Sequence, residues 1–144
     1  MEIQESGKLK EANYPPKRTC EIMKTNENSQ QDKRVAVVIL NWNGRALMEE
    51  FLPSVVAYTP SKQAEIIVAD NGSTDDSIEM LKTKFPMVHI IRLDRNYGFA
   101  EGYNQALKHI RHEYAVLLNS DVEVTPGWLD APVTAMDADK TIAG

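Results

Sequence analysis

Three apolar runs in this 144-residue sequence are each followed at once by polar side chains. The runs are VAVVIL (35–40), EIIVA (65–69) and YAVLL (114–118). The side chains that follow them are carboxylates and amides, namely Asn41, Asn43, Asp70, Asn71, Asn119 and Asp121. Such groups accept hydrogen bonds from a base or a ribose and supply oxygen ligands to hard cations. The three segments are therefore candidates for one binding site.

Asp121 is the candidate for metal chemistry. With the oxygen-bearing Asn119 and Ser120 beside it, its carboxylate suits a divalent cation held by one or two carboxylates together with substrate phosphates. Asp70 precedes the turn-rich residues 71–74, whose backbone N–H groups would be available as donors next to the carboxylate. Either segment by itself is equally typical of a turn that only ends a strand or caps a helix.

The apolar runs also predict the elements that must position these residues. We expect strands at 35–40, 65–70, 88–93 and 114–119, and helices at 45–58, 75–84 and 98–111. Pro53 is expected to kink or shorten the first helix, and Ser73 and Asp76 are spaced like a capping box for the second. Strands that alternate with helices predict an α/β fold with a mainly parallel central sheet covered on both faces.

The segment RNYGFAEGYNQAL (95–107) adds a loop-to-helix transition at the edge where ligands of open α/β sheets bind, beyond the carboxyl ends of the strands. Gly98 permits backbone angles that other residues resist, and a helix starting there would direct N–H groups and its positive dipole end at an anion. Alone, the segment is more typical of an ordinary helix entry. The buried face of this helix is expected to comprise Phe99, Tyr103, Ala106, Leu107 and Ile110.

Composition limits the classes of function. The chain is 42% hydrophobic, enough for one ordinary core, and its net charge of -5 argues against a nucleic-acid partner. Residues 1–33 are mostly polar and show no sustained period, so we expect a disordered N-terminal tail, with Met1 or Met23 as the start of translation. A single cysteine and the absence of a signal-like or membrane-spanning apolar run are typical of a cytoplasmic protein.

Taken together, four segments resemble, in order and spacing, the family 2 glycosyltransferases of the GT-A fold, in particular their rhamnosyltransferase-like branch. The segments are ILNWNG, IIVADNGSTDDS, RNYGFAEGYNQAL and YAVLLNSDVEVTPGWL. The resemblance extends over residues 34–144. It implies a Rossmann-like α/β sandwich in which residues 34–144 form the donor-binding portion of such an enzyme, incomplete at its C-terminus.

The resemblance also implies which residues would surround a nucleotide diphosphate-sugar donor. They are Asn41, Asn43, Asp70, Asn71, Gly98, Asn104 and Asn119. Asp70 would lie by the base, and Gly98 and Asn104 would line the diphosphate-sugar side. Residues 119–121 match the Asp-X-Asp position of the family, with Asn119 in place of the first aspartate and Asp121 as the carboxylate that would hold Mg²⁺ or Mn²⁺.

The implied reaction transfers the sugar to a hydroxyl of a glycan or lipid-linked acceptor, with inversion at the anomeric carbon. The cation would act as a Lewis acid on the departing diphosphate, and a carboxylate would act as general base. In the family that base lies beyond the metal motif, and this sequence ends at DKTIAG, where a further strand is expected to begin. The acidic residues after the motif are Glu123, Asp130, Asp137 and Asp139. Their spacing is more typical of solvated helix positions, so we expect the base beyond Gly144.

The same branch implies cell-surface polysaccharide synthesis, with peripheral association at the inner face of the cell membrane. Other functions stay open as alternatives. A truncated, catalytically inactive nucleotide-binding module would keep the donor-side residues and lack the base. A nucleotidyltransferase needs a glycine-rich basic loop after the first strand and a dinucleotide-dependent oxidoreductase needs Gly-X-Gly-X-X-Gly there, and NWNGRALMEE provides neither. A phosphoacceptor domain would not explain residues 95–107.

Two further groups of residues invite a functional interpretation. His109, His112 and Glu113 lie close in sequence but lack the His-Glu-X-X-His spacing of a zinc site, and histidines near the negative end of a helix dipole explain them better. Trp42 and Trp128 could stack on a sugar or a base, although aromatic residues at such places more often serve packing.

Overall fold

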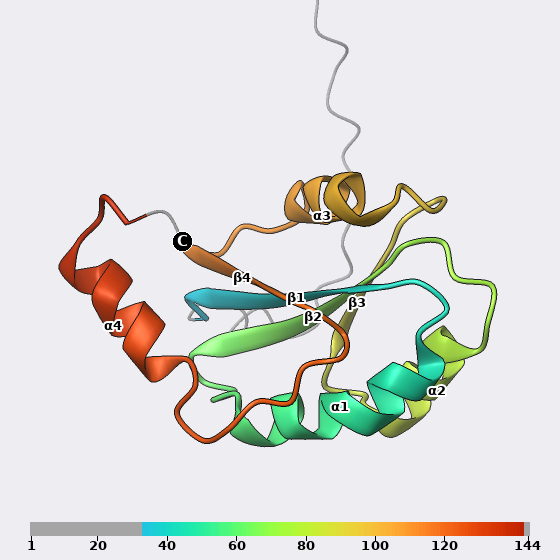
Figure 1. Ribbon diagram of the computed structural model, residues 1–144, viewed down its shortest axis with the longest axis horizontal. Coiled ribbons are helices and arrows are strands. Elements are labelled where there is room, and N and C mark those ends of the chain that lie inside the picture. The colour runs from blue at the N-terminus through green and yellow to red at the C-terminus, as the bar shows by residue number, and fades with distance from the viewer. Residues whose placement is uncertain (1–32, 143–144) are drawn as a thin grey trace, which may run out of the picture.

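The computed structural model describes residues 33–142, so the expectations for residues 1–32 and 143–144 lie outside the described residues. The chain forms a four-stranded parallel sheet with helices on both faces (Figure 1). In chain order the elements are β1 (Val35–Asn41), α1 (Arg45–Tyr58), β2 (Ala64–Asp70), α2 (Ser77–Lys84), β3 (His89–Arg92), α3 (Phe99–Leu107), β4 (Tyr114–Leu118) and α4 (Asp130–Ala138). The predicted α/β class with a parallel sheet is confirmed.

The strand order is β3-β2-β1-β4, which places β1 between β2 and β4. Asn41 pairs with Asp70 at the end of the β1–β2 ladder, and Ile39 pairs with Leu118 at the end of the β1–β4 ladder. Since all four strands run in the same direction, their carboxyl ends lie at one edge of the sheet. The polar segments that follow β1, β2 and β4 therefore start at this common edge, as predicted.

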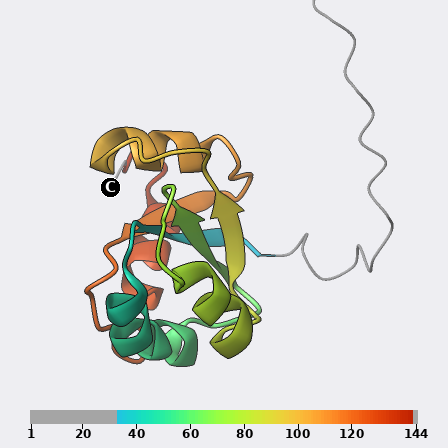
Figure 2. The same cartoon turned by 90° about the vertical axis from the view of Figure 1, so that its right-hand side faces the viewer.

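The core consists of two clusters, one on each face of the sheet. Val35, Val37 and Ile39 of β1 pack with buried side chains of α1 and α2, which lie together below the sheet in Figure 2. Ala36 and Val38 point to the other face and pack with Tyr103 and Ala106 of α3. The near-continuous burial of β1 explains why its sequence shows no alternation between apolar and polar residues.

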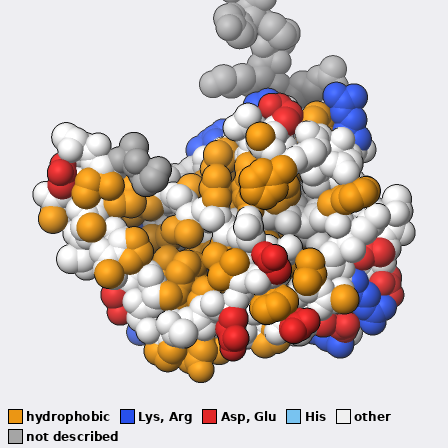
Figure 3. Space-filling view, viewed as in Figure 1, with side chains coloured by type: hydrophobic (Ala, Val, Ile, Leu, Met, Phe, Trp, Pro, Cys, Tyr) orange, Lys and Arg blue, Asp and Glu red, His pale blue; other side chains and the backbone are white. Residues whose placement is uncertain are grey.

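β4 departs from the expectation that helices cover both faces of the sheet. Among the described residues α3 packs mainly on β1 and β2, and Leu117 of β4 is 50% exposed. Figure 3 shows hydrophobic side chains gathered on this side of the molecule, over the region of β4 and toward α4. The apolar run at 114–118 therefore correctly predicted a strand, but it did not predict burial on both sides.

The helices differ from their predicted forms in three places. α1 is not shortened at Pro53, which lies exposed inside a helix that continues to Tyr58. α2 begins at Ser77, and the predicted capping box is wrong, because the cap residue Asp76 makes no side-chain capping bond while the Asp75 Oδ1 accepts the Ser77 N–H at 3.1 Å. α3 ends at Leu107 rather than Arg111. The segment where a further strand was expected to begin is described only to residue 142, and over 139–142 it contains a turn at Lys140 and Thr141 and no strand.

A cluster of ion pairs attaches α4 to the start of β4. Arg34 Nε donates to Glu113 Oε2 at 2.8 Å and Arg34 Nη2 donates to Asp137 Oδ1 at 2.6 Å. The Tyr114 hydroxyl donates to the same Asp137 oxygen at 2.8 Å. The hydrogen bonds from Arg34 are the main reason that the pKa of Glu113 is lowered to about 2 and that the pKa of Asp137 is also lowered.

This cluster predicts an acid-dependent loss of stability. A carboxyl group with a lowered folded-state pKa stabilises the folded chain above its unfolded pKa and loses that contribution as the pH falls toward the folded pKa. For Glu113 the window extends from 4.5 down to about 2. The Tm of wild type should therefore exceed that of Glu113→Gln at neutral pH, and the two should converge as the pH approaches the lower limit.

Circular dichroism melts across this pH range measure the difference. The control is Glu50→Gln, since Glu50 is an exposed glutamate for which the described structure shows no ion pair. The cluster is exposed, so the difference should be modest and should shrink in about 1 M salt, where charges are screened within about 3 Å. Coincident curves for wild type and Glu113→Gln would show that Glu113 contributes nothing, and a constant offset would contradict the predicted pH dependence.

Candidate functional site

Asn41 and Asp70 lie side by side at the ends of β1 and β2, and both are about 1% exposed. Asn41 Nδ2 donates to Asp70 Oδ1 at 3.1 Å and to Ser77 Oγ at 2.9 Å. The Asp70 Oδ2 accepts the Ser73 N–H at 3.2 Å, and the Asn41 Oδ1 accepts the Gly44 N–H at 3.2 Å. Their polar atoms are thus satisfied by neighbouring turns, so both side chains hold the rim of the sheet in place.

Asn43 connects the turn after β1 with the turn before α2. Its backbone has a positive φ of 51°, which asparagine tolerates better than most residues. The Asn43 Oδ1 accepts the N–H of Thr74 at 2.7 Å and that of Asp75 at 3.2 Å, and its own N–H donates to Ser73 Oγ at 2.9 Å. Asn43 therefore fixes the position of two turns that are thirty residues apart in the sequence.

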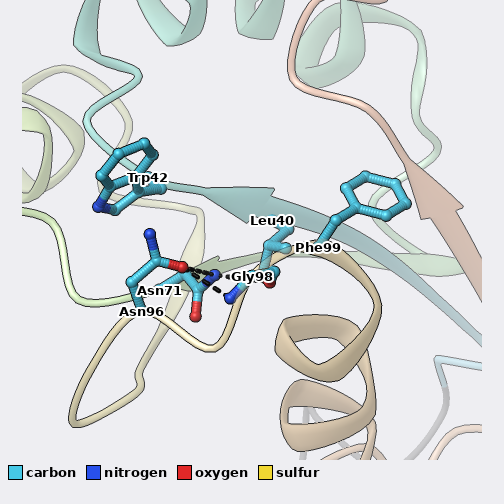
Figure 4. Close-up of a pocket in the computed structure, with 6 residues that line it drawn as sticks. All are labelled: Leu40, Trp42, Asn71, Asn96, Gly98 and Phe99. Atoms are coloured by element: carbon cyan, nitrogen blue, oxygen red, sulfur yellow. Dashed lines mark hydrogen bonds between the residues drawn. The ribbon is translucent and has the colours of Figure 1, made fainter.

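Asn71 fixes the loop that leads into α3. It is buried, and its Nδ2 donates to Asn96 Oδ1 at 3.0 Å and to the Gly98 carbonyl at 2.9 Å. The Asn71 Oδ1 accepts the Tyr97 N–H at 2.9 Å. The Asn96 Oδ1 also accepts the Gly98 N–H at 2.7 Å, so one amide side chain directly after β2 and one from the loop hold the start of α3 (Figure 4).

A pocket of about 310 Å³ opens beside these amides. It is lined by Leu40, Trp42, Asn71, Asn96, Gly98 and Phe99. In Figure 4 Trp42 lies at one side and Phe99 at the other, with Leu40 and the two amides between them. Apolar and aromatic walls with a few polar groups are typical of a site for a small planar ligand such as a base.

The sequence-based expectations for two of the lining residues, Trp42 and Phe99, can be compared with their exposure. Trp42 is 57% exposed, so it is available for the stacking that the sequence left as an alternative. Phe99 is 67% exposed, and its predicted place on the buried face of α3 is wrong. Asn96 and Phe99 were not among the candidate site residues. No sequence signal separated them from their neighbours, since the helical period assigned Phe99 to the core.

Asn119 and Asp121 follow β4 and are exposed. Residues 33–142 contain no group of three or more His, Cys, Asp and Glu side chains that could hold a metal ion. The ligands that residues 119–121 offer are therefore one carboxylate, one amide and one hydroxyl. This set fits a Mg²⁺-type cation that shares the phosphates of a bound substrate, because such ions are held by one or two carboxylates plus phosphates.

Three other predicted features lie elsewhere. Asn104 is exposed on α3 and donates to Glu101 Oε2 at 3.3 Å, outside the set that lines the pocket. His112 Nε2 lies 3.0 Å from Glu65 Oε2, so its contact is with β2 rather than with the end of α3. Trp128 packs against the core, in agreement with the interpretation as a packing residue.

The fold and the pocket define an α/β protein with a pocket at the carboxyl edge of a parallel sheet, the edge at which open α/β sheets bind their ligands. Residues 36–144 match the family model of glycosyl transferase family 2, and the chain belongs to this family. The sheet and its flanking helices are the GT-A fold that the sequence predicted.

Relatives with curated names support this assignment. The chain is 30% identical over 116 residues to an undecaprenyl-phosphate 4-deoxy-4-formamido-L-arabinose transferase of Edwardsiella ictaluri, covering 76% of this chain and 36% of that protein. It is 24% identical over 110 residues to an N-acetylglucosaminyl-diphospho-decaprenol L-rhamnosyltransferase of Mycobacterium tuberculosis, covering 69% of this chain and 36% of that protein. The chain thus spans about a third of the length of either relative.

A solved structure shows the same fold. The mannosyltransferase PcManGT of Pyrobaculum calidifontis, in complex with GDP-Man and Mn²⁺, superposes with a TM-score of 0.65 at 25% identity. The superposition covers 79% of this chain and 35% of that protein. Among the described helices of the present chain, none has the length and apolar character needed to cross a membrane.

Proposed function

We propose that this chain forms the donor-binding portion of an inverting glycosyltransferase that transfers a sugar from a nucleotide diphosphate-sugar to an acceptor hydroxyl. The observation that carries the proposal is the convergence of the β1, β2 and β4 exits and the 96–98 loop at one edge of the sheet in a family 2 chain. The divalent cation in the complex of the mannosyltransferase supports a Mg²⁺ or Mn²⁺ requirement here.

Different residues of the chain would bind the base, the diphosphate and the cation of the donor. Trp42 and Phe99 would contact the base in the pocket, while Asn71 holds the loop beneath it. Gly98 starts α3, whose first N–H groups carry the positive end of the helix dipole and favour the diphosphate. Asp121, together with Asn119, would hold the cation, which when bound supplies Lewis-acid stabilisation of the departing diphosphate.

The general base is proposed to lie beyond Gly144. An effective base has a pKa near the working pH. Hydrogen bonds from Arg34 and Tyr114 lower the pKa of Asp137, which makes it a poor proton acceptor. Glu123, Asp130 and Asp139 are exposed, and none of them lines the pocket.

The acceptor is proposed to be a lipid-linked glycan, because the names of both curated relatives refer to polyprenyl-linked compounds. The corresponding role is cell-surface polysaccharide synthesis. A lipid-linked acceptor would bring the protein to the cytoplasmic face of the membrane as a peripheral partner. The transferred sugar of the rhamnosyltransferase relative makes a deoxyhexose one candidate among the sugars to be tested.

A thermal-shift series with UDP, dTDP and GDP, each with and without Mn²⁺, tests the proposal. At ten times Kd, ligand binding should stabilise the wild-type chain by about 1.4 kcal/mol and raise Tm by about 5 °C. Asp121→Asn should lose the metal-dependent part of this rise, because an amide lacks the charge that attracts the cation. Asp130→Asn, which removes an exposed carboxylate from α4, should keep the full rise.

Different outcomes would contradict donor binding, contradict the metal-binding role of Asp121, or favour a module without catalysis. No rise with any nucleotide would contradict donor binding, and a rise that does not depend on the metal would contradict the role of Asp121. The alternative, a nucleotide-binding module without catalysis, would be favoured if protein that includes the proposed base bound the nucleotide-sugar but did not transfer the sugar.

A further inference from the structure

Tyr103 is buried under the pocket and joins two strands of the sheet. Its hydroxyl donates to the Leu118 carbonyl at 2.9 Å and accepts the Leu40 N–H at 3.4 Å. Its ring packs edge-to-face on Phe99, with ring centroids 5.2 Å apart. Burial raises the pKa of the phenol and the hydrogen bond from Leu40 opposes this change, so the hydroxyl keeps its proton and acts as a donor at neutral pH.

The two strands diverge at the point that this hydroxyl bridges. The β1–β4 ladder ends with the pair Ile39 and Leu118, and residues 119–121 follow directly. The Leu118 carbonyl lies in the same rigid peptide plane as the Asn119 N–H. A hydrogen bond that fixes this carbonyl therefore fixes the direction in which the chain leaves β4 toward Asp121.

The same hydroxyl also connects the other parts of the site. Leu40, whose N–H it accepts, lines the pocket and is two residues before Trp42. Tyr103 belongs to α3, five residues after Gly98, so its position follows that of the 96–98 loop. One buried oxygen atom thus links the exits of β1 and β4 to the helix start that faces the pocket.

We propose that Tyr103 is a positioning residue, which holds the 119–121 segment at the correct distance from the pocket so that the donor's diphosphate and its cation are bound together. The proposal rests on the proposed donor-binding function. It concerns a hydroxyl that touches neither ligand and acts through the Leu118 peptide.

Tyr103→Phe tests the proposal because it removes only the oxygen and keeps the ring that packs on Phe99. The affinity for UDP, dTDP and GDP is measured calorimetrically with and without Mn²⁺. In the variant the gain in affinity on adding Mn²⁺ should fall by about fivefold to tenfold, the equivalent of about one hydrogen bond, while the metal-free affinity changes by less than about twofold. The control is Tyr114→Phe, which removes a hydrogen-bonded hydroxyl from the opposite end of β4 and should leave both affinities unchanged.

Amide NMR spectra of the ligand-free proteins provide a second readout. Tyr103→Phe should shift and broaden the amide signals of residues 119–121 and leave those of α4 unchanged. Unchanged signals at 119–121 would overturn the positioning role whatever the nucleotide data show. Equal losses of metal-free and metal-dependent affinity would also overturn it, because they would indicate a general structural defect. A wild-type chain that binds no nucleotide while the 119–121 signals still respond would overturn the donor-binding function alone.

Discussion

Gly72→Ala is expected to lower the free energy of unfolding by about 2 to 5 kcal/mol. Gly72 has a φ of +73°, a conformation that costs other residues about 1 to 2 kcal/mol. A Cβ atom at this position would also lie 2.6 Å from the Arg95 carbonyl carbon and 2.8 Å from the Asn96 nitrogen. These are backbone atoms, so no side-chain rotation relieves the clash, and the loop before α3 must move. The corresponding fall in Tm is about 10 °C or more, measurable by calorimetry.

Gly98→Ala is the matched control for this substitution. Gly98 has a φ of +75°, yet no heavy atom lies within 4 Å of a Cβ built there. Its cost is therefore backbone strain alone, about 1 to 3 kcal/mol. Gly72→Ala should be the more destabilising of the two, because it adds the clash with the 95–96 backbone to the strain of a positive φ. Equal losses would show that the loop adapts freely and that β2 does not fix it closely.

Asn71→Ala is expected to cost about 2 to 4 kcal/mol and to release the loop that forms one wall of the pocket. The substitution leaves three buried or partly buried partners without the Asn71 amide, namely Asn96 Oδ1, the Gly98 carbonyl and the Tyr97 N–H. Denaturant unfolding measures the loss of stability. Hydrogen exchange measures the loop directly, because the Tyr97 amide should lose protection while amides in β1 keep theirs.

Asn104→Ala gives the comparison for this prediction. Asn104 is exposed and makes one long hydrogen bond of 3.3 Å to Glu101, so its loss should change stability by less than about 0.5 kcal/mol. If Asn71→Ala unfolds no more readily than Asn104→Ala, then the bonds from Asn71 to the 96–98 loop contribute little. Unaltered protection of the Tyr97 amide would lead to the same conclusion.

Most of the fold could be predicted because its strands are short apolar runs that end in polar turns. β1 and β2 were predicted to within one residue, since runs of β-branched residues buried on both faces are a strong local signal. The orientation of α3 could not be predicted in the same way. A Cβ on Gly102 would lie 2.9 Å from both Asn71 Nδ2 and Leu40 Cδ2, so α3 packs closely on the sheet through Gly102 and its neighbours. This contact turns Phe99 outward to the pocket.

The order of residues along the chain was enough to place polar side chains at the carboxyl ends of three strands, because each apolar run and the residues that end it are adjacent in sequence. It could not decide what those side chains bind. Asn41 and Asp70 are separated by 29 residues, and only the parallel pairing of β1 with β2 brings them within 3.1 Å of each other. A hydrogen bond depends on distances of a few tenths of an ångström between distant segments. Tertiary packing therefore decided that Asn41 and Asp70 support the rim, whereas Trp42, Asn96 and Phe99 line the pocket.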